Sequence, residues 1–154
     1  VDDFLVPLKG YVRHDRLVSA DALPFRPSKG VYLMVSRFAD HRSPEAEDIY
    51  RWYDQVRIPD LLDCPGAAGA WTFASRHLFI PDGDQSRPVM RITLVYLESD
   101  PVDFAAAIAA RRGQWARTGR ERDTSPTEEA LFAGPFRAVD PWKPARFAAS
   151  EGNA

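Results

Sequence analysis

One predicted helix carries side chains that could bind and polarise an anionic substrate. Tyr53 and Arg57 are four residues apart, which places them on adjacent turns of one helix flank. A phenol and a guanidinium at this spacing could hold an oxyanion by charge-assisted hydrogen bonds. We therefore predict catalytic roles for these two residues. Three neighbours on the same helix are predicted to contact the substrate: Tyr50, Trp52 and Asp60.

A predicted strand contributes the second set of candidate residues. Side chains alternate along a strand, so His77 shares a face with Trp71 and Phe73. Imidazole changes its charge near neutral pH, and His77 is therefore a candidate general acid/base. Arg91 opens the next strand and is a further candidate contact. Aromatic walls with one phenol, one cation and one imidazole suit a flat, apolar, anionic substrate, such as an aromatic or polyketide acid. Alternatively, His77 is structural or exposed and Arg91 lies on a solvated rim.

The helix residues also have structural explanations. Tyr53 and Trp52 could be core side chains whose polar tips are hydrogen-bonded. Arg57 could pair with Asp54 or Asp60 at helical spacing. The spacing by itself does not separate these alternatives from a substrate site.

The elements that must position these residues follow a regular order. Ser43-Pro44 and Asp100-Pro101 each combine an N-cap with a proline at the first helical position, and Pro59 and then Pro65-Gly66 are expected to end the first helix. β-branched and aromatic runs predict four strands, at 31–38, 70–80, 89–97 and 129–133. The helices fall after Ser43 and over 100–119. The order β-α-β-β-α-β is the ferredoxin-like plan of an α+β sandwich.

Two of the predicted strands are apolar on both faces. Strand 31–38 is apolar at Val31 and Leu33 but also at Tyr32 and Met34, and strand 89–97 shows the same pattern. A strand with one wet face alternates apolar with polar residues. Two helices cover only one face of a four-stranded sheet, so we expect a homodimer to cover the other. Alternatively, the chain's own ends cover it.

Composition limits the classes of function. The 154 residues are 45 % hydrophobic and 27 % charged, with a formal net charge of −2, so no overall positive charge attracts nucleic acid or an anionic membrane. No apolar run reaches the length of a membrane span. A single cysteine, Cys64, fits a reducing compartment, and we expect a cytoplasmic protein. We expect neither a metal, because the His and Cys residues lack ligand spacing, nor another cofactor, because nucleotide-binding motifs are missing.

Residues 52–62, which read Trp-Tyr-Asp-Gln-Val-Arg-Ile-Pro-Asp-Leu-Leu before the turn Pro65-Gly66, carry a resemblance. Together with strand 31–36, this segment resembles the dimeric α+β barrel superfamily and is closest to its EthD-like branches. In those sequences the helix reads Trp-Tyr-Asp-x-x-His-x-Pro-x-Leu-Leu. This chain has Arg57 where the relatives have histidine. If that histidine is the acid/base of the relatives, this protein has lost it, moved it or never used it.

The resemblance implies a homodimeric α+β barrel with a pocket between helices and sheet. It implies a cofactor-independent isomerase, lyase, cyclase or monooxygenase acting on a small hydrophobic acid. A non-catalytic small-molecule-binding or interaction protein of the same fold is the alternative, and the fold alone does not choose. The predicted organisation is an N-terminal arm and linker over 1–29, the barrel domain over 30–140, and a tail over 141–154.

Overall fold

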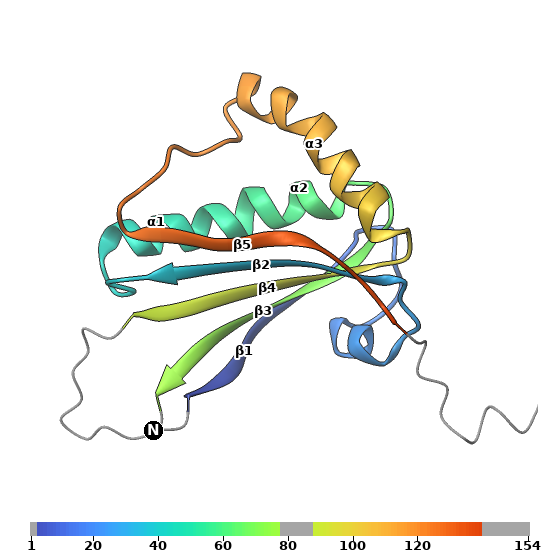
Figure 1. Ribbon diagram of the computed structural model, residues 1–154, viewed down its shortest axis with the longest axis horizontal. Helices are drawn as coiled ribbons and strands as arrows, with labels where there is room; N and C mark the ends of the chain where they lie inside the picture. Colours follow the sequence, from blue (N-terminus) through green and yellow to red (C-terminus); the bar gives the residue numbers. More distant parts are fainter. Residues whose placement is uncertain (1–2, 78–87, 140–154) are drawn as a thin grey trace, which may run out of the picture.

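The computed structural model describes residues 3–77 and 88–139 (Figure 1). Within these ranges, five strands form one antiparallel sheet in the order β1-β3-β4-β2-β5. Their bounds are β1 (Asp3–Val12), β2 (Gly30–Phe38), β3 (Ala67–His77), β4 (Val89–Leu97) and β5 (Glu128–Arg137). The predicted α+β class is confirmed, and the architecture is compatible with the ferredoxin-like plan.

The three α-helices of the described residues lie on one face of the sheet (Figure 1). α1 (Pro44–Trp52) continues through a π-helical turn, η2 (Tyr53–Arg57), into α2 (Ile58–Leu62), and α3 (Pro101–Arg117) follows β4. The predicted N-caps are confirmed, because Ser43 and Asp100 accept hydrogen bonds from backbone N–H groups of the first turns. The helical run does not stop at Pro59 but continues to Leu62, and it ends before Pro65-Gly66 as predicted.

The last strand is longer than the predicted 129–133. β5 continues past the predicted stop because Pro135 lies on an edge strand, where a proline nitrogen facing outward removes no ladder hydrogen bond. The Ala138 N–H, three residues further on, donates to the Lys29 carbonyl of the segment before β2. Backbone nitrogens alternate between the two edges of a strand, so the Pro135 nitrogen, three residues before that of Ala138, faces away from β2.

The predicted N-terminal arm packs on the domain, and residues 3–12 of it form β1, which pairs antiparallel with β3. The sequence pattern did not indicate this strand, because Pro7 and Gly10 interrupt it. After β1 the chain forms a short 3₁₀ helix, η1 (Ala20–Phe25), in which Leu23 is buried. The predicted tail over 141–154 lies outside the described residues.

Two apolar clusters lie between the helices and the sheet. The larger one joins α2, α3, β3 and β4, and includes Ile58, Leu61, Phe104 and Trp115. The smaller one is built from Phe38, Ala46 and Ile49. The π-helical turn η2, which has no buried residue of its own, lies along the chain between the segments that supply the two clusters.

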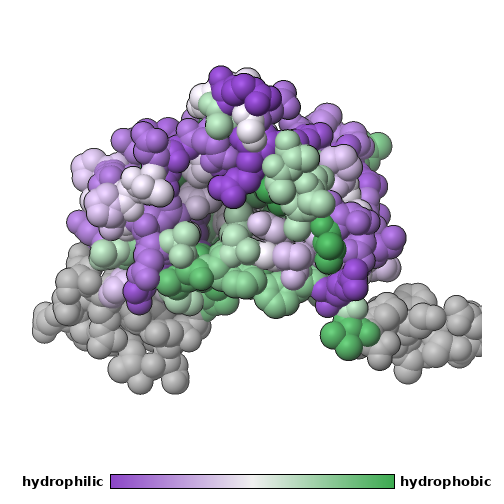
Figure 2. Space-filling view, turned by 45° about the horizontal axis from the view of Figure 1, so that its top comes forward, coloured by the Kyte–Doolittle hydropathy of each residue, from purple (hydrophilic) through white to green (hydrophobic). Residues whose placement is uncertain are grey.

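The opposite face of the sheet, here called the outer sheet face, is also apolar. Strand register places side chains of four strands on it, and all are partly or well exposed: Val31, Leu33, Val35, Phe73, Ile92, Leu94, Phe132 and Phe136. The helix η1 covers one part of this face, where Leu23 lies against Gly69. Figure 2 shows a further apolar band along the β5 edge, where Leu131 is 44 % exposed. The predicted imbalance between apolar sheet surface and helix cover is therefore present in the described chain.

Candidate functional site

The candidate site begins at the π-helical turn η2. The Ile58 N–H donates to the carbonyl of Tyr53, five residues earlier, so this turn is wider than an α-helical one. Pro59 follows directly and has neither an N–H to donate nor room for a tight turn before it. The widened turn accommodates that proline inside a continuous helical run. π-helical turns of this kind are frequent at functional sites.

Asp54 of this turn is held by two donors on one carboxylate oxygen. The Tyr11 hydroxyl, from β1, donates to Asp54 Oδ1 at 2.5 Å, and Arg91 Nη2, from β4, donates to the same atom at 2.9 Å. Oδ2 has no hydrogen-bond partner among the described residues, and the side chain is 33 % exposed. Asp54 is thus an oriented carboxylate with one oxygen left to accept a proton or a ligand donor.

Arg91 is buried beneath the helical run. Its side chain is 9 % exposed, and its guanidinium carbon lies 4.7 Å from the ring centre of Tyr50 and 5.7 Å from that of Tyr53. Aromatic faces attract a cation at these distances. Its Nε is buried without a hydrogen-bond partner in the described part of the chain. The predicted contact residue therefore lies inside the site, and the alternative of a solvated rim position is wrong.

A second carboxylate of the site, the buried Glu128, begins β5. It accepts hydrogen bonds from Tyr53 at 2.6 Å and from Ser36 at 2.7 Å, both on Oε1, while Arg122 pairs with Oε2. The Glu128 side chain is only 6 % exposed. Arg91 thus balances the charge of Asp54, and Arg122 balances the charge of Glu128.

The phenols around these carboxylates are held in the neutral form. Burial and, next, the Glu128 charge raise the pKa of Tyr53 to about 12. Burial, opposed by Arg91, raises the pKa of Tyr50 to about 12. Burial, followed by the hydrogen bond to Asp54, also raises the pKa of Tyr11. All three hydroxyls therefore keep their protons near neutral pH, and those of Tyr11 and Tyr53 donate to carboxylates.

Arg57 lies on the α3 side of the turn. Its guanidinium is 4.8 Å from the ring centre of Trp52 and 5.0 Å from that of Trp115, and Nη2 pairs with Glu121 at 2.5 Å. Arg57 therefore pairs with neither aspartate that helical spacing offered. The side chain is 12 % exposed, so it is largely enclosed by these partners.

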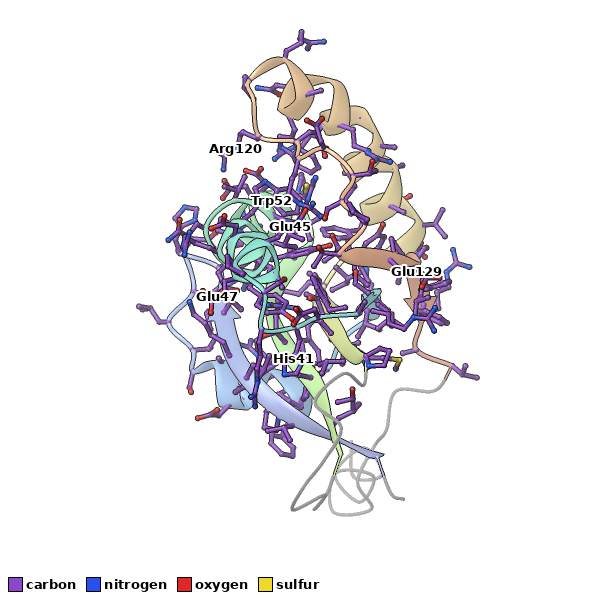
Figure 3. All side chains as sticks on the ribbon, turned by 90° about the vertical axis from the view of Figure 1, so that its left-hand side faces the viewer. His41, Glu45, Glu47, Trp52, Arg120 and Glu129 are labelled. Atoms are coloured by element: carbon purple, nitrogen blue, oxygen red, sulfur yellow. The ribbon has the colours of Figure 1, made fainter. Side chains whose placement is uncertain are left out.

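The connection between α3 and β5, residues 118–127, crosses over the helical run. Arg120 Nε donates to both oxygens of the buried Asp60, at 2.8 and 2.9 Å, and the Trp52 indole donates to the Arg120 carbonyl at 3.1 Å. Glu45 accepts from hydroxyls further along the same connection. Figure 3 shows Glu45, Trp52 and Arg120 on the helix side of the sheet and Glu129 at its β5 edge.

The structure brings together only part of the predicted set. The helix side collects six of the predicted residues: Tyr50, Trp52, Tyr53, Arg57, Asp60 and Arg91. Trp71 and Phe73 instead point to the outer sheet face, because they stand opposite Leu94 and Ile92 in the register. The Trp71 indole donates to the Ala20 carbonyl of η1 at 2.8 Å. The side chain of His77 lies outside the described residues, so its predicted role stays a prediction.

Three residues of the site were missing from the predicted set. The sequence pattern indicates Asp54 only as a partner of Arg57, it places Glu128 just before a predicted strand, and it places Tyr11 in the predicted arm. Buried Glu128 is 75 residues away from Tyr53, and no local pattern signals such a contact. A carboxylate next to the tyrosine of the helix motif was the one available signal.

The described residues contain no group of three or more His, Cys, Asp or Glu side chains that could hold a metal ion. None of the described helices has the length and apolar character needed to cross a membrane. No protein family, curated protein or solved structure was found to match this chain. The resemblance of residues 52–62 to the EthD-like proteins therefore stays a prediction.

Proposed function

We propose that this chain is a cofactor-independent enzyme that moves a proton on a small hydrophobic acid, with Asp54 as the general base. The observation that carries the proposal is the asymmetric carboxylate: two donors fix Oδ1, Oδ2 has no partner among the described residues, and the side chain is 33 % exposed. A general base needs this combination of fixed orientation and an available acceptor. Of the activities expected from the resemblance, isomerase, lyase and cyclase chemistry use such a base most directly, and monooxygenase chemistry is a further option.

The proposed step begins with a proton on carbon next to a carbonyl group. Asp54 Oδ2 accepts this proton, and the electron pair of the broken C–H bond moves into the carbonyl to form an enolate. The Arg91 guanidinium, 2.9 Å from the other Asp54 oxygen, supplies positive charge beside the reacting groups. Returning the proton to a different atom gives an isomer, and loss of a leaving group gives elimination.

The aromatic surroundings support a flat apolar substrate. The rings of Tyr50 and Tyr53 both face the Arg91 cation, and Trp52 packs at 5.0 Å against Tyr53. Apolar walls with a few fixed polar groups are typical of small-molecule sites. An oxyanion-binding role of Tyr53 and Arg57, as expected from their spacing, requires both residues to exchange their glutamate partners for the substrate.

These same ion pairs favour the alternative function, a non-catalytic binding or interaction protein. Glu128 and Glu121 already satisfy Tyr53 and Arg57, and Arg120 satisfies Asp60. A constellation built only for stability would look the same at these three residues. Asp54 Oδ2 is the atom that distinguishes the enzyme from this alternative.

A homodimer joined through the outer sheet face is part of the proposal. Strands of nine residues are about 30 Å long at about 3.3 Å per residue, and five strands span about 20 Å, so the face measures roughly 600 Å². Stable interfaces bury about 800 Å² per partner, which is a similar area. A second copy presents the same apolar strip and obeys two-fold symmetry. Sedimentation equilibrium tests this, and a monomer at all concentrations would contradict it.

The activity is tested by hydrogen–deuterium exchange on carbon. Aromatic and polyketide-type keto acids are incubated in D₂O with the protein, and loss of the C–H signal is followed by proton NMR. We expect exchange or turnover of at least one acid, which Asp54→Asn abolishes and Asp48→Asn retains. Asp48 is a matched control because it lies on α1, is 72 % exposed, and among the described residues pairs only with Arg51. Binding of an acid without exchange would favour the non-catalytic alternative.

A further inference from the structure

The strand β1 stands outside the β-α-β-β-α-β order, yet one of its side chains completes the candidate site. Tyr11 reaches Asp54 across 43 residues of sequence, at 2.5 Å from hydroxyl to Oδ1. β1 pairs only with β3 at the edge of the sheet. An edge strand outside that order thus presents a phenol to the helix side of the sheet.

A β-bulge in β1 decides which way Tyr11 points. Before the bulge, Pro7 stands opposite Phe73, whose side chain lies on the outer sheet face. The register shifts around Leu8, and Tyr11 then stands opposite Ala70, which is buried on the helix side. Because strand side chains alternate with a period of two, Tyr11 would point to the outer face without this extra residue. Bulges commonly re-aim a side chain next to an active site.

The bulge is fixed by contacts on both sides. The Thr72 hydroxyl donates to the Lys9 carbonyl at 3.2 Å. A Cβ on Gly10 would lie 2.5 Å from the Ala20 Cβ and 2.9 Å from the Trp71 ring, so only glycine fits between β3 and η1 here. The register of β1 is therefore locked at the two residues that precede Tyr11.

We propose that Tyr11 is a positioning residue for Asp54, turned onto Oδ1 by the bulge at Leu8 so that Oδ2 stays directed to the substrate. This inference rests on the proposed function and adds the N-terminal strand to it. Arg91 donates to the same oxygen, so the two donors together restrict rotation of the carboxylate. A carboxylate held by only one of them has more freedom to turn its basic oxygen away.

A purely structural role for Tyr11 is the competing explanation, since its ring packs against the larger apolar cluster. Phenylalanine would fill that space equally well, and the hydroxyl alone separates the two roles. Tyr11→Phe is thus the informative variant. Tyr96→Phe is its matched control, because Tyr96 is a partly buried tyrosine on β4 whose side chain lies on the outer sheet face, away from Asp54.

The kinetic test uses the keto acid that exchanges fastest with the full-length chain. We expect Tyr11→Phe to lower kcat about 10- to 100-fold, the rate equivalent of one hydrogen bond to a charged group, with KM within about twofold. Tyr96→Phe should leave both constants unchanged. Wild-type kcat in Tyr11→Phe combined with loss of activity in Asp54→Asn overturns this inference alone. Wild-type kcat in Asp54→Asn overturns the proposed function as well.

A second measurement needs no substrate. Tyrosine labelled with carbon-13 at Cζ reports the pKa of each phenol by NMR titration. Replacing Asp54 by asparagine should lower the pKa of Tyr11, because the carboxylate charge next to the hydroxyl opposes formation of the phenolate. The pKa of Tyr96 should not move. An unchanged Tyr11 titration in Asp54→Asn means that the two side chains are not bonded, and it overturns the inference whatever the activity.

Discussion

Replacing Glu128 by alanine is the sharpest test of the polar cluster beneath the helical run. The Glu128 carboxylate is 6 % exposed and receives three donors, from Tyr53, Ser36 and Arg122. The alanine variant leaves the two hydroxyls without their acceptor and the arginine without its counter-ion. Removing one partner of a buried ion pair costs about 3–5 kcal/mol in the free energy of unfolding. Arg122 is 24 % exposed and can regain some water, so we expect about 3 kcal/mol.

The next residue along β5 supplies a matched control. Glu129 also pairs with an arginine, Arg37 of β2, but these side chains are 58 % and 47 % exposed. Exposed ion pairs contribute about 0–1 kcal/mol. Glu129→Ala should therefore lower the free energy of unfolding by less than about 1 kcal/mol. Both variants remove the same side chain from the same strand, so the difference isolates burial.

Urea denaturation followed by tryptophan fluorescence measures both values. Unfolding should be recorded at several protein concentrations, because dissociation of a dimer would make the midpoint concentration-dependent. Equal losses for Glu128→Ala and Glu129→Ala, or a loss below about 1 kcal/mol for both, would refute the reasoning. Glu128 would then not be the acceptor that links β5 to the π-helical turn.

Three further predictions concern pH, assembly and backbone packing. Folded Tyr53 keeps its proton to about pH 12, whereas an unfolded tyrosine ionises near pH 10, so its contribution to stability is complete below pH 10 and is lost as the pH rises toward 12. Alkaline denaturation should show less of this loss in Tyr53→Phe. Phe132→Asp on the outer sheet face should convert dimers to monomers in sedimentation equilibrium, while Val102→Asp, on the exposed side of α3, should not. Gly10→Ala should destabilise the chain by about 1–3 kcal/mol in urea because a Cβ has no room there, whereas Gly113→Ala inside α3 should stabilise it by up to about 1 kcal/mol.

The parts of the fold that local pattern determines were predictable. β2 and β4 are rich in β-branched and aromatic residues, and the strand predicted over 89–97 has the observed bounds. Ser43 and Asp100 each precede a proline, which indicates a helix start through chemistry within four residues. β1 was not predictable in the same way. Its bulge reverses the alternation of side chains midway, so no single face of the strand is apolar throughout.

The site was predictable only where its residues share one helix. Tyr53 and Arg57 were selected from their spacing, but their partners Glu128 and Glu121 lie more than 60 residues further along the chain. The strand pattern also predicts Trp71 beside Tyr53 and Arg57. It shows which residues share a face of the strand, but it does not show which face of the sheet the helices cover. That choice depends on the register with β4 and on η1, which packs against the indole from the other side.

The helix itself departs from its pattern at the residue to which we assign the chemistry. In an ideal α-helix whose apolar stripe includes Ile49 and Val56, Asp54 would face solvent. The π-helical turn changes the phase of the run between two apolar clusters, and one oxygen of the aspartate meets an arginine and a tyrosine from the sheet. Departures from local sequence rules are expected at functional sites. Three such departures meet at Asp54 Oδ1: the wide turn, the re-aimed Tyr11 and the buried Arg91.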